Sequence, residues 1–465
     1  MKIQTIMCPQ TVLAEEKVDP VFLSDEVYRR RKQLLDARIR QLDMDYIIMY
    51  GDREHFANIE YFTKYDCRFE EALFIVRKDG TSWIVVGNEG MPYSAIVPFE
   101  INRFYYGNFS LQGQPRYKTP VLSQLFREIG INNHSKVGIA GYKYYECGVD
   151  VVPEKCFDIP TYIYQSIENV TGCENLSDFT RELTSLPDGL RMKIRSANEI
   201  AFIEYQAVVA ANTMRRLISG VKEGMSEIEL SANACADLRP NMAFANILVG
   251  EQSVRLGLKS PDDFSRLKDG NPMTLSFSTR GSMCARSGVA AYGYESLSEQ
   301  QKEKFDHLYK NYWKAIAAWY ATIGIGTKGR VLYSVVAEYI GAPEFGLGLN
   351  PGHSIGMDEW TNSPVSIDSE IAIHSGTHIQ CDIIASCSSP MMNAICEDTV
   401  VIADVSLREQ LHFQFPEVYD RIIARQSFMR NVLNIPIKDE VLLMSGLNAI
   451  MFPFMLSRKE IYALA

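Results

Sequence analysis

The sequence lacks a long basic cluster, and it is acidic overall, with a formal net charge of −10 over 465 residues. Binding to nucleic acid requires a concentrated positive face that neutralises phosphate groups. We therefore expect no nucleic-acid partner. The densest basic run is Arg29-Arg30-Arg31-Lys32, which we interpret as the solvated side of an amphipathic helix.

Long apolar runs and leader-like patterns are also missing. No window reaches the length of a membrane span, and the start of the chain does not show the positive-then-apolar pattern of a secretory signal. We expect a cytoplasmic protein that does not act at a membrane. The ten cysteines include no close CxxC pair and no zinc-clamp spacing. Free thiols in a reducing compartment fit this pattern, and we interpret Cys284 and Cys381 as buried structural residues rather than nucleophiles.

Length and composition indicate two folded domains. A chain of 465 residues exceeds what one hydrophobic core usually organises. Its 46% hydrophobic and 22% charged residues are typical of a globular protein. The pattern changes around Pro187-Asp188-Gly189, which places the predicted boundary between a domain at 1–188 and a domain at 189–465.

The first domain alternates helical and extended patterns. Two apolar runs on either side of Asp79-Gly80 predict a β-hairpin, because Asp-Gly supplies the turn chemistry. The expected elements are helices at 24–42 and 122–129 and strands at 46–50, 72–76, 82–86 and 136–140. We predict a compact α/β domain.

The second domain contains three Ser-x-x-Glu/Gln motifs, which are typical of the first turn of a helix. They predict helices that begin at Ser196, Ser226 and Ser298. The first runs to Ile218, the second runs toward Leu238, and the third carries Trp313, Ile316 and Tyr320. Extended segments lie between them, at 243–249, 273–279, 290–294, 378–385 and 399–403. Helices mixed with mostly antiparallel strands indicate an α+β fold.

Four segments of the chain resemble a known family. The most specific are Pro351-Gly-His-Ser-Ile-Gly356 and Ile395-Cys-Glu-Asp-Thr-Val-Val401, and Leu190–Glu199 and Gly224–Glu227 add to them. They resemble the catalytic domain shared by creatinase, aminopeptidase P, prolidase and methionine aminopeptidase. The resemblance implies a C-terminal pita-bread domain preceded by a creatinase-type α/β domain, and a homodimer.

Transferred residue by residue, the five metal-binding positions of the family fall on Ser276, Ser287, His353, Asp382 and Glu397. The two serines replace aspartates, and neutral hydroxyls cannot supply the charge and bridging oxygens that hold paired divalent ions. We therefore expect no metal cofactor. A single ion held by His353, Asp382 and Glu397 is an alternative, because one imidazole with two carboxylates suits several transition metals.

Two further departures concern histidines that the family carries. Trp360 stands where peptidase members have a second histidine, and the stretch 249–257 lacks the histidine expected there. Both changes disfavour ordinary cleavage of proline peptides.

Creatinase is the informative relative, because the resemblance includes a member that hydrolyses a carbon–nitrogen bond without metal. Two nearby carboxylates raise one of their pKa values, so that one side chain can act as an acid and the other as a base. Our leading prediction is a metal-independent hydrolase of a small polar C–N substrate or short peptide. The predicted catalytic residues are His353, Asp382 and Glu397, and the predicted substrate-binding residues are Ser276, Ser278, Ser287 and Arg280.

The loop around Arg68 and Phe69 completes the predicted site. In dimers of the resembled family, the corresponding loop reaches toward the active site of the partner subunit. The resemblance thus implies that Arg68 and Phe69 contribute a charged clamp and an aromatic wall.

Three readings of the polar centre stay open at this stage. Besides the metal-independent hydrolase, the residues fit a single-metal Xaa-Pro peptidase or amidase, and a pita-bread protein that binds a ligand without turnover. His353, Asp382 and Glu397 could also form a satisfied structural network with Arg280 or Arg286.

Overall fold

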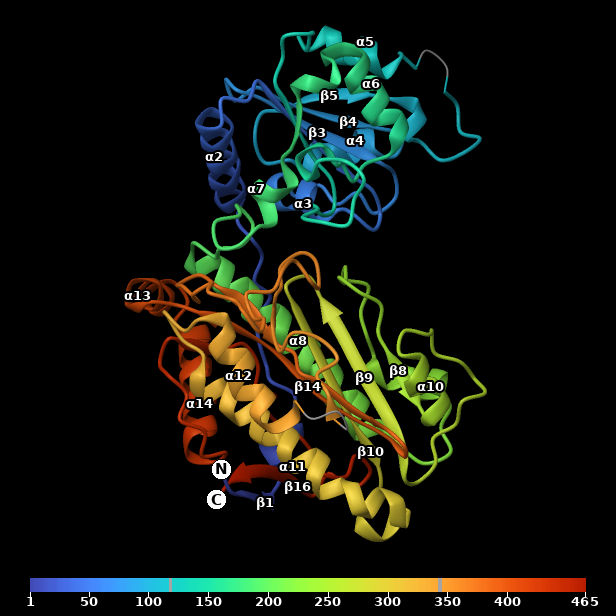
Figure 1. The fold of residues 1–465 in the computed structure, drawn as a ribbon, viewed down its shortest axis with the longest axis vertical. Helices are drawn as coiled ribbons and strands as arrows, with labels where there is room; N and C mark the ends of the chain where they lie inside the picture. Colours follow the sequence, from blue (N-terminus) through green and yellow to red (C-terminus); the bar gives the residue numbers. More distant parts are fainter. Residues whose placement is uncertain (117–118, 342–344) are drawn as a thin grey trace. The chain divides into compact units, whose positions relative to one another are not determined.

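The structure is a computed structural model that describes residues 1–116, 119–341 and 345–465. The chain forms two compact units, one of residues Leu23–Met192 and one of Met1–Phe22 with Lys193–Ala465 (Figure 1). The observed boundary lies close to the predicted one. Our assignment of residues 1–22 to the N-terminal domain is wrong, because β1 (Ile3–Met7) pairs with β16 (Glu460–Leu464) at the other end of the chain.

The N-terminal unit is built on a mixed six-stranded sheet in the order β5-β4-β3-β2-β6-β7. The strands are β2 (Tyr46–Gly51), β3 (Ala72–Arg77), β4 (Ser82–Val86), β5 (Asn102–Tyr105), β6 (Val137–Ala140) and β7 (Leu176–Asp178). The helices are α2 (Asp25–Gln41), α3 (Ala57–Thr63), α4 (Gly90–Tyr93), α5 (Leu122–Glu128), α6 (Thr161–Thr171) and α7 (Thr180–Thr184). All six elements predicted for this domain are present, including the β3–β4 hairpin.

The described helices of the C-terminal unit are α1 (Gln10–Leu13), α8 (Ala197–Gly220), α9 (Glu227–Ser231), α10 (Glu251–Leu256), α11 (Glu299–Thr322), α12 (Gly329–Ile340), α13 (Val405–Gln414) and α14 (Pro416–Asn431). Three of them, α8, α9 and α11, begin at the predicted caps Ser196, Ser226 and Ser298. Ser226 and Ser298 form reciprocal capping boxes. The helix expected to run toward Leu238 ends at Ser231, because Cys235 adopts a left-handed conformation after one further turn.

The described strands of this unit form an eight-stranded sheet in the order β11-β12-β14-β10-β9-β8, with β13 and β15 also paired to β14. They are β8 (Ile247–Val249), β9 (Asn271–Thr279), β10 (Ser282–Ala290), β11 (His353–Ser354), β12 (His378–Cys381), β13 (Ile384–Ser388), β14 (Met391–Ile402) and β15 (Val441–Leu443). The strand predicted at 290–294 is wrong. A tight turn at Arg280-Gly281 makes β10 the hairpin partner of β9, and β10 ends at Ala290.

Helices pack against the large sheet of the C-terminal unit. Helix α8 packs against β9 and β10, and helix α11 packs against β13 and β14 (Figure 1). Helix α12 packs on α11. Helix α11 contributes Trp313, Trp319 and Tyr312 to the main core, each fully buried. Burial of each such side chain stabilises the fold by about 1.5–3 kcal/mol or more.

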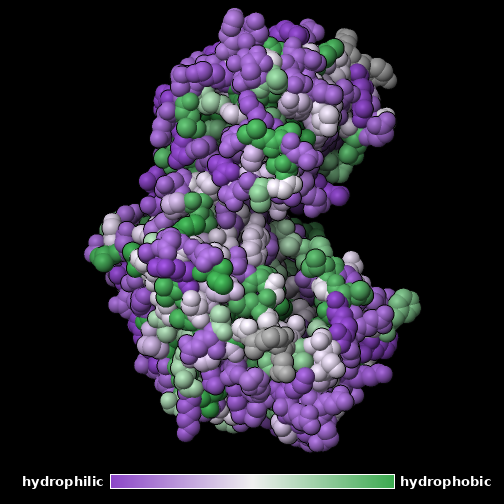
Figure 2. Space-filling model, in the orientation of Figure 1, coloured by the Kyte–Doolittle hydropathy of each residue, from purple (hydrophilic) through white to green (hydrophobic). Residues whose placement is uncertain are grey.

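The face shown in Figure 2 is largely hydrophilic, with separate hydrophobic patches. Exposed apolar side chains in the C-terminal unit include Leu238, Leu258 and Phe264. Within the described part of the chain, no helix is both long enough and apolar enough to cross a membrane.

Candidate active site

The register of the large sheet places the predicted site residues on one face. Ala285 of β10 pairs with both Ser276 of β9 and Glu397 of β14, and Gln380 of β12 pairs with His353 of β11. Directly paired residues project from the same face of a sheet, and so do alternate residues along a strand. Ser276, Glu397, Gln380 and His353 therefore share a face, and Asp382 follows Gln380 at the end of β12.

The opposite face belongs to the hydrophobic core. It carries Cys284, Cys381 and Cys396, which are buried free thiols in the main core cluster. Burial raises the pKa of each thiol. The structural role predicted for Cys284 and Cys381 agrees with this position, because a buried neutral thiol is a poor nucleophile.

His353 is the centre of a buried acidic cluster. Its Nε2 atom lies 3.4 Å from Glu359 Oε1, 3.7 Å from Asp382 Oδ2 and 3.9 Å from Glu397 Oε1. The predicted catalytic residues therefore converge, and Glu359 joins them. Sequence reasoning missed Glu359, because the segment Asp358-Glu359-Trp360 was read only for the histidine that it lacks.

Trp360 and Ser354 fix the orientation of the imidazole. The indole stacks on the His353 ring, with centroids 4.2 Å apart and planes 12° from parallel. Nδ1 of His353 lies 3.4 Å from the carbonyl oxygen of Ser354. With Nδ1 directed at a backbone acceptor, Nε2 faces the carboxylates.

Gln380 orients the carboxylate of Glu397 through a hydrogen bond. Its Nε2 donates to Glu397 Oε1 at 2.9 Å and to the Met283 carbonyl oxygen at 2.9 Å. Gln380 was not predicted as a site residue, although it stands two residues before Asp382 and alternation along a strand could have indicated it.

The pKa values of the cluster show the cost of bringing these acids together. Burial and the negative charge of Glu397 raise the pKa of Asp382 well above its usual value, and burial raises the pKa of Glu359 to about 7. Burial alone would lower the pKa of His353, but the neighbouring carboxylates of Glu397, Asp382 and Glu359 raise it to about 9. The cluster therefore takes up positive charge, as protons or as a cation.

The donor set fits one metal ion. Ligand atoms of His353, Glu359 and Glu397 all lie within 4.8 Å of one another, and Asp382 adjoins them. His353 Nε2 and Asp382 Oδ1 are buried and have no hydrogen-bond partner among the described residues. One imidazole with carboxylate oxygens is a ligand set for several divalent transition metals.

The predicted substrate-binding serines have local partners. Ser276 Oγ accepts from the Asn246 N–H at 2.9 Å, and Ser278 Oγ donates to the Ala243 carbonyl oxygen at 2.8 Å. Ser287 Oγ donates to Thr274 Oγ1 at 2.8 Å. These contacts satisfy the hydrogen-bonding groups of the three serine hydroxyls within the fold. A role of the serines in substrate binding stays a prediction.

The arginines near the site differ in position. Arg280 is buried in the β9–β10 turn and is not a solvated hairpin tip. Arg286 is fully buried and donates to both carboxylate oxygens of Asp398 at 2.9 and 3.0 Å. Because Arg286 and Asp398 project from the core face, Arg286 does not neutralise the side chain of Glu397 or Asp382.

Arg68 and Phe69 lie in the N-terminal unit, and both are exposed. The exposed fraction is 58% for the Arg68 side chain and 58% for the whole Phe69 residue. Arg68 Nε lies 3.9 Å from Asp66 Oδ2. Their predicted role at a partner's site stays a prediction.

Comparisons with known proteins identify the fold. No protein-family model matches the sequence, and neither does any curated protein. Among solved structures, the chain is similar to those titled Xaa-Pro dipeptidase from Bacillus anthracis, prolidase from Pyrococcus horikoshii OT3 and X-Pro aminopeptidase from Thermotoga maritima MSB8. Each match has a TM-score of 0.60, with sequence identities of 14%, 14% and 15%. The matches cover 82%, 80% and 80% of this chain and 96%, 95% and 95% of the other chains.

These likenesses concern the fold of the chain. The chain has the two-domain architecture of the prolidase and aminopeptidase P structures, with a pita-bread domain after a creatinase-type α/β domain. The predicted α+β fold class is confirmed, and so is the resemblance as far as it concerns the fold.

Proposed function

We propose that this chain hydrolyses a carbon–nitrogen bond in a small peptide-like substrate with the help of one divalent cation. His353, Glu359, Asp382 and Glu397 would hold the ion. The observation that carries the proposal is the buried convergence of three carboxylates on His353 Nε2. This differs from our leading sequence-based prediction of a metal-independent enzyme, because Glu359 adds an anionic ligand that the transferred family positions did not include.

Electrostatics favours an ion in this cluster. Two like charges about 4 Å apart repel by roughly 4 kcal/mol at an effective dielectric constant of 20. Three ionised carboxylates gathered around His353 Nε2 need compensating positive charge, which protons or a cation can supply. In the described part of the chain, the ion pairs of Glu359, Asp382 and Glu397 all run to His353, and none runs to lysine or arginine.

The protein side chains around the ion would each do one task. Trp360 orients His353, and Gln380 orients Glu397. Glu359, whose side chain is 30% exposed, marks the side of the cluster that solvent and substrate reach. A bound divalent ion supplies a polarised carbonyl and a more acidic water.

The solved structures suggest the first substrates to test. Those with similar folds are titled as Xaa-Pro dipeptidases and an X-Pro aminopeptidase. We extend this substrate class, peptides with a bond before proline, to the present chain as part of the proposal. Trp360 stands where peptidase members of the resembled family have a second histidine. The proposal therefore includes a substrate specificity that differs from theirs.

A metal-independent hydrolase is the second candidate, and the pKa of His353 favours it. With a pKa of about 9, the imidazole is protonated at neutral pH and can donate a proton to a substrate atom. Asp382, held partly neutral by burial, or Glu397 would complete an acid–base pair.

Metal analysis combined with a substrate screen tests the proposal. Protein purified without chelator is analysed for bound metal, and turnover is measured on Xaa-Pro dipeptides, cyclic amides, guanidino acids and N-methylated amino acids before and after chelation. His353→Ala serves as the site variant, and His307→Ala, at an exposed position on α11, is the matched control.

Each outcome decides between the readings. One equivalent of metal, with turnover that chelation and His353→Ala both abolish, supports the proposal. Turnover that survives complete removal of metal supports the second candidate. Stoichiometric metal without turnover of any substrate favours a ligand-binding protein, and absence of both metal and turnover contradicts the proposal. The homodimer and the cytoplasmic location expected from the sequence stay predictions.

A further inference from the structure

A cavity lies in the C-terminal unit, and none of the four proposed metal ligands lines it. Its volume is about 330 Å³, the lower end of the range of small-molecule sites, about 300–1,000 Å³. Four cationic side chains and one carboxylate line it, and they are Lys17, Arg215, Arg421, Arg425 and Glu16. They come from the N-terminal segment and from helices α8 and α14.

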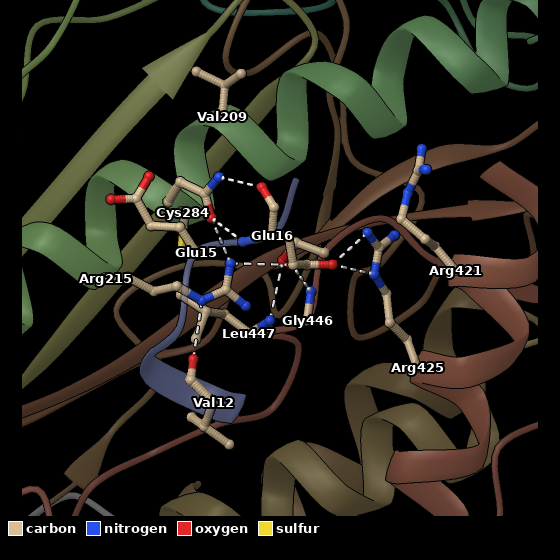
Figure 3. Close-up of polar contacts among 12 residues, drawn as sticks. Val12, Glu15, Glu16, Val209, Arg215, Cys284, Arg421, Arg425, Gly446 and Leu447 are labelled. Carbon is tan, nitrogen blue, oxygen red and sulfur yellow. Dashed lines mark hydrogen bonds and ion pairs between the residues drawn. The ribbon is translucent and has the colours of Figure 1, made fainter. Parts of the chain in front are cut away.

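Glu16 is the anchor of the arginine network. Arg425 on α14 and Arg215 on α8 both point at its carboxylate (Figure 3), with Arg425 Nη2 at 2.6 Å and Arg215 Nη1 at 3.0 Å. The Gly446 N–H donates to the same carboxylate at 2.9 Å. Burial alone would raise the pKa of Glu16, but these partners lower it to about 2. Glu16 is therefore an anion at neutral pH.

Glu204 is the second carboxylate of the network, and it lies fully buried behind the arginines. It accepts from Arg421 Nε and Nη2 at 2.8 and 2.9 Å and from Arg425 Nη2 at 2.7 Å. Glu16 and Glu204 together compensate two of the four positive charges. Glu417 lies one helical turn before Arg421, and its negative charge attracts the Arg421 guanidinium. Because Glu417 is exposed, solvent screens this attraction.

The uncompensated charge lies on the open side of the cavity. Lys17 is exposed and forms no ion pair with another described residue. Arg421 uses Nε and Nη2 for Glu204, and its Nη1 makes no hydrogen bond within the described ranges. These two groups remain available to an external anion, which arginine binds well through directed N–H groups.

The remaining lining includes the polar residues Thr11, Ser445 and Asn448 and an apolar part. Phe428 and Met429 of α14 and Leu443 of β15 form part of the wall. A cavity with a cationic side and an apolar side fits a ligand of the same character. We propose that this cavity binds a small organic anion, with a carboxylate or phosphate head at Lys17 and Arg421 and an apolar body against Phe428 and Leu443.

Calorimetry on the full chain with 3-phenylpropionate tests this site. Its uncharged analogue 3-phenylpropanamide has the same body without the charge, and phenyl phosphate and inorganic phosphate distinguish the two head groups. We expect one binding site for 3-phenylpropionate or phenyl phosphate, and about tenfold weaker binding of the amide, which corresponds to roughly 1.4 kcal/mol.

Two variants localise the binding without touching the buried network. Lys17→Gln removes one exposed charge, and Ala424→Glu adds a carboxylate at an exposed lining position of α14. Arg330→Gln is the control, because Arg330 pairs with exposed Glu370 away from this cavity. We expect each lining variant to weaken anion binding about tenfold or more, and the control to leave it unchanged.

The results can overturn the proposal in two ways. Absence of binding of all three anions at millimolar concentration would exclude an anion site of this kind. Binding that Lys17→Gln and Ala424→Glu leave unchanged would place the ligand elsewhere. Because the assay reads binding at a cavity separate from His353, its result does not depend on metal or on turnover.

Discussion

Replacing Glu16 by glutamine removes the central charge of the arginine network while keeping the shape of the side chain. The pKa of Glu16 is lowered from 4.5 to about 2, and a shift of one unit corresponds to about 1.36 kcal/mol. The side chain is only 21% exposed, so solvent screening is limited. We expect Glu16→Gln to lower the free energy of unfolding by about 3 kcal/mol at pH 7.

The effect should depend on pH with a definite sign. The pKa of Glu16 is depressed in the folded protein, so its stabilisation is fully present above about pH 4.5 and is lost as the pH falls toward 2. Over that window the difference between the native protein and the variant should shrink by about 1.4 kcal/mol per pH unit.

Urea unfolding followed by tryptophan fluorescence measures this difference. Trp313, Trp319 and Trp360 report on the C-terminal unit, and Trp83 on the N-terminal unit. Glu15→Gln is the control, because Glu15 forms a half-exposed pair with Arg216 that contributes about 0–1 kcal/mol. If Glu16→Gln is no less stable than Glu15→Gln at pH 7, or if its deficit does not shrink between pH 5 and pH 3, the electrostatic reasoning is refuted.

Four further predictions concern the site and its support. Glu359→Gln should weaken binding of one divalent ion at least about tenfold in calorimetry, and an unchanged affinity would remove Glu359 from the ligand set. Ser276→Asp combined with Ser287→Asp should raise bound metal toward two equivalents, because both positions project from the face that carries Glu397, and a metal content that stays at one would contradict that geometry. Trp360→Ala should lower metal affinity by releasing the stacked imidazole while leaving the urea midpoint within a few tenths molar; a large loss of stability would instead assign Trp360 to the core. Arg286→Met should destabilise the C-terminal unit by about 3–5 kcal/mol, because it leaves Asp398 buried without its partner, and a neutral result would show that Asp398 is protonated.

Local sequence signals predicted most of the secondary structure. The caps at Ser226 and Ser298 and the Asp79-Gly80 hairpin were correct, because a helix start or a tight turn depends on side chains within a few residues. The same local rule failed beyond Ser231, where no motif announced the left-handed residue Cys235 that follows the helix.

The residues of the candidate site were likewise predictable only where a local motif contains them. His353, Asp382 and Glu397 were identifiable because each stands in a short motif that resembles a known family. Glu359 has no such motif, and only the folding of the loop after β11 brings it to 3.4 Å from His353.

The sequence by itself determined the class of the fold, the starts of three helices in the C-terminal unit and three of the four residues of the cluster around His353, because each of these depends on neighbours along the chain. Tertiary structure alone decided that the first 22 residues join the C-terminal unit, that Arg286 faces the core, and that Glu16 lies among arginines about 200 and 400 positions away. Such contacts depend on which distant segments pack together, and the local pattern of a chain does not contain that information.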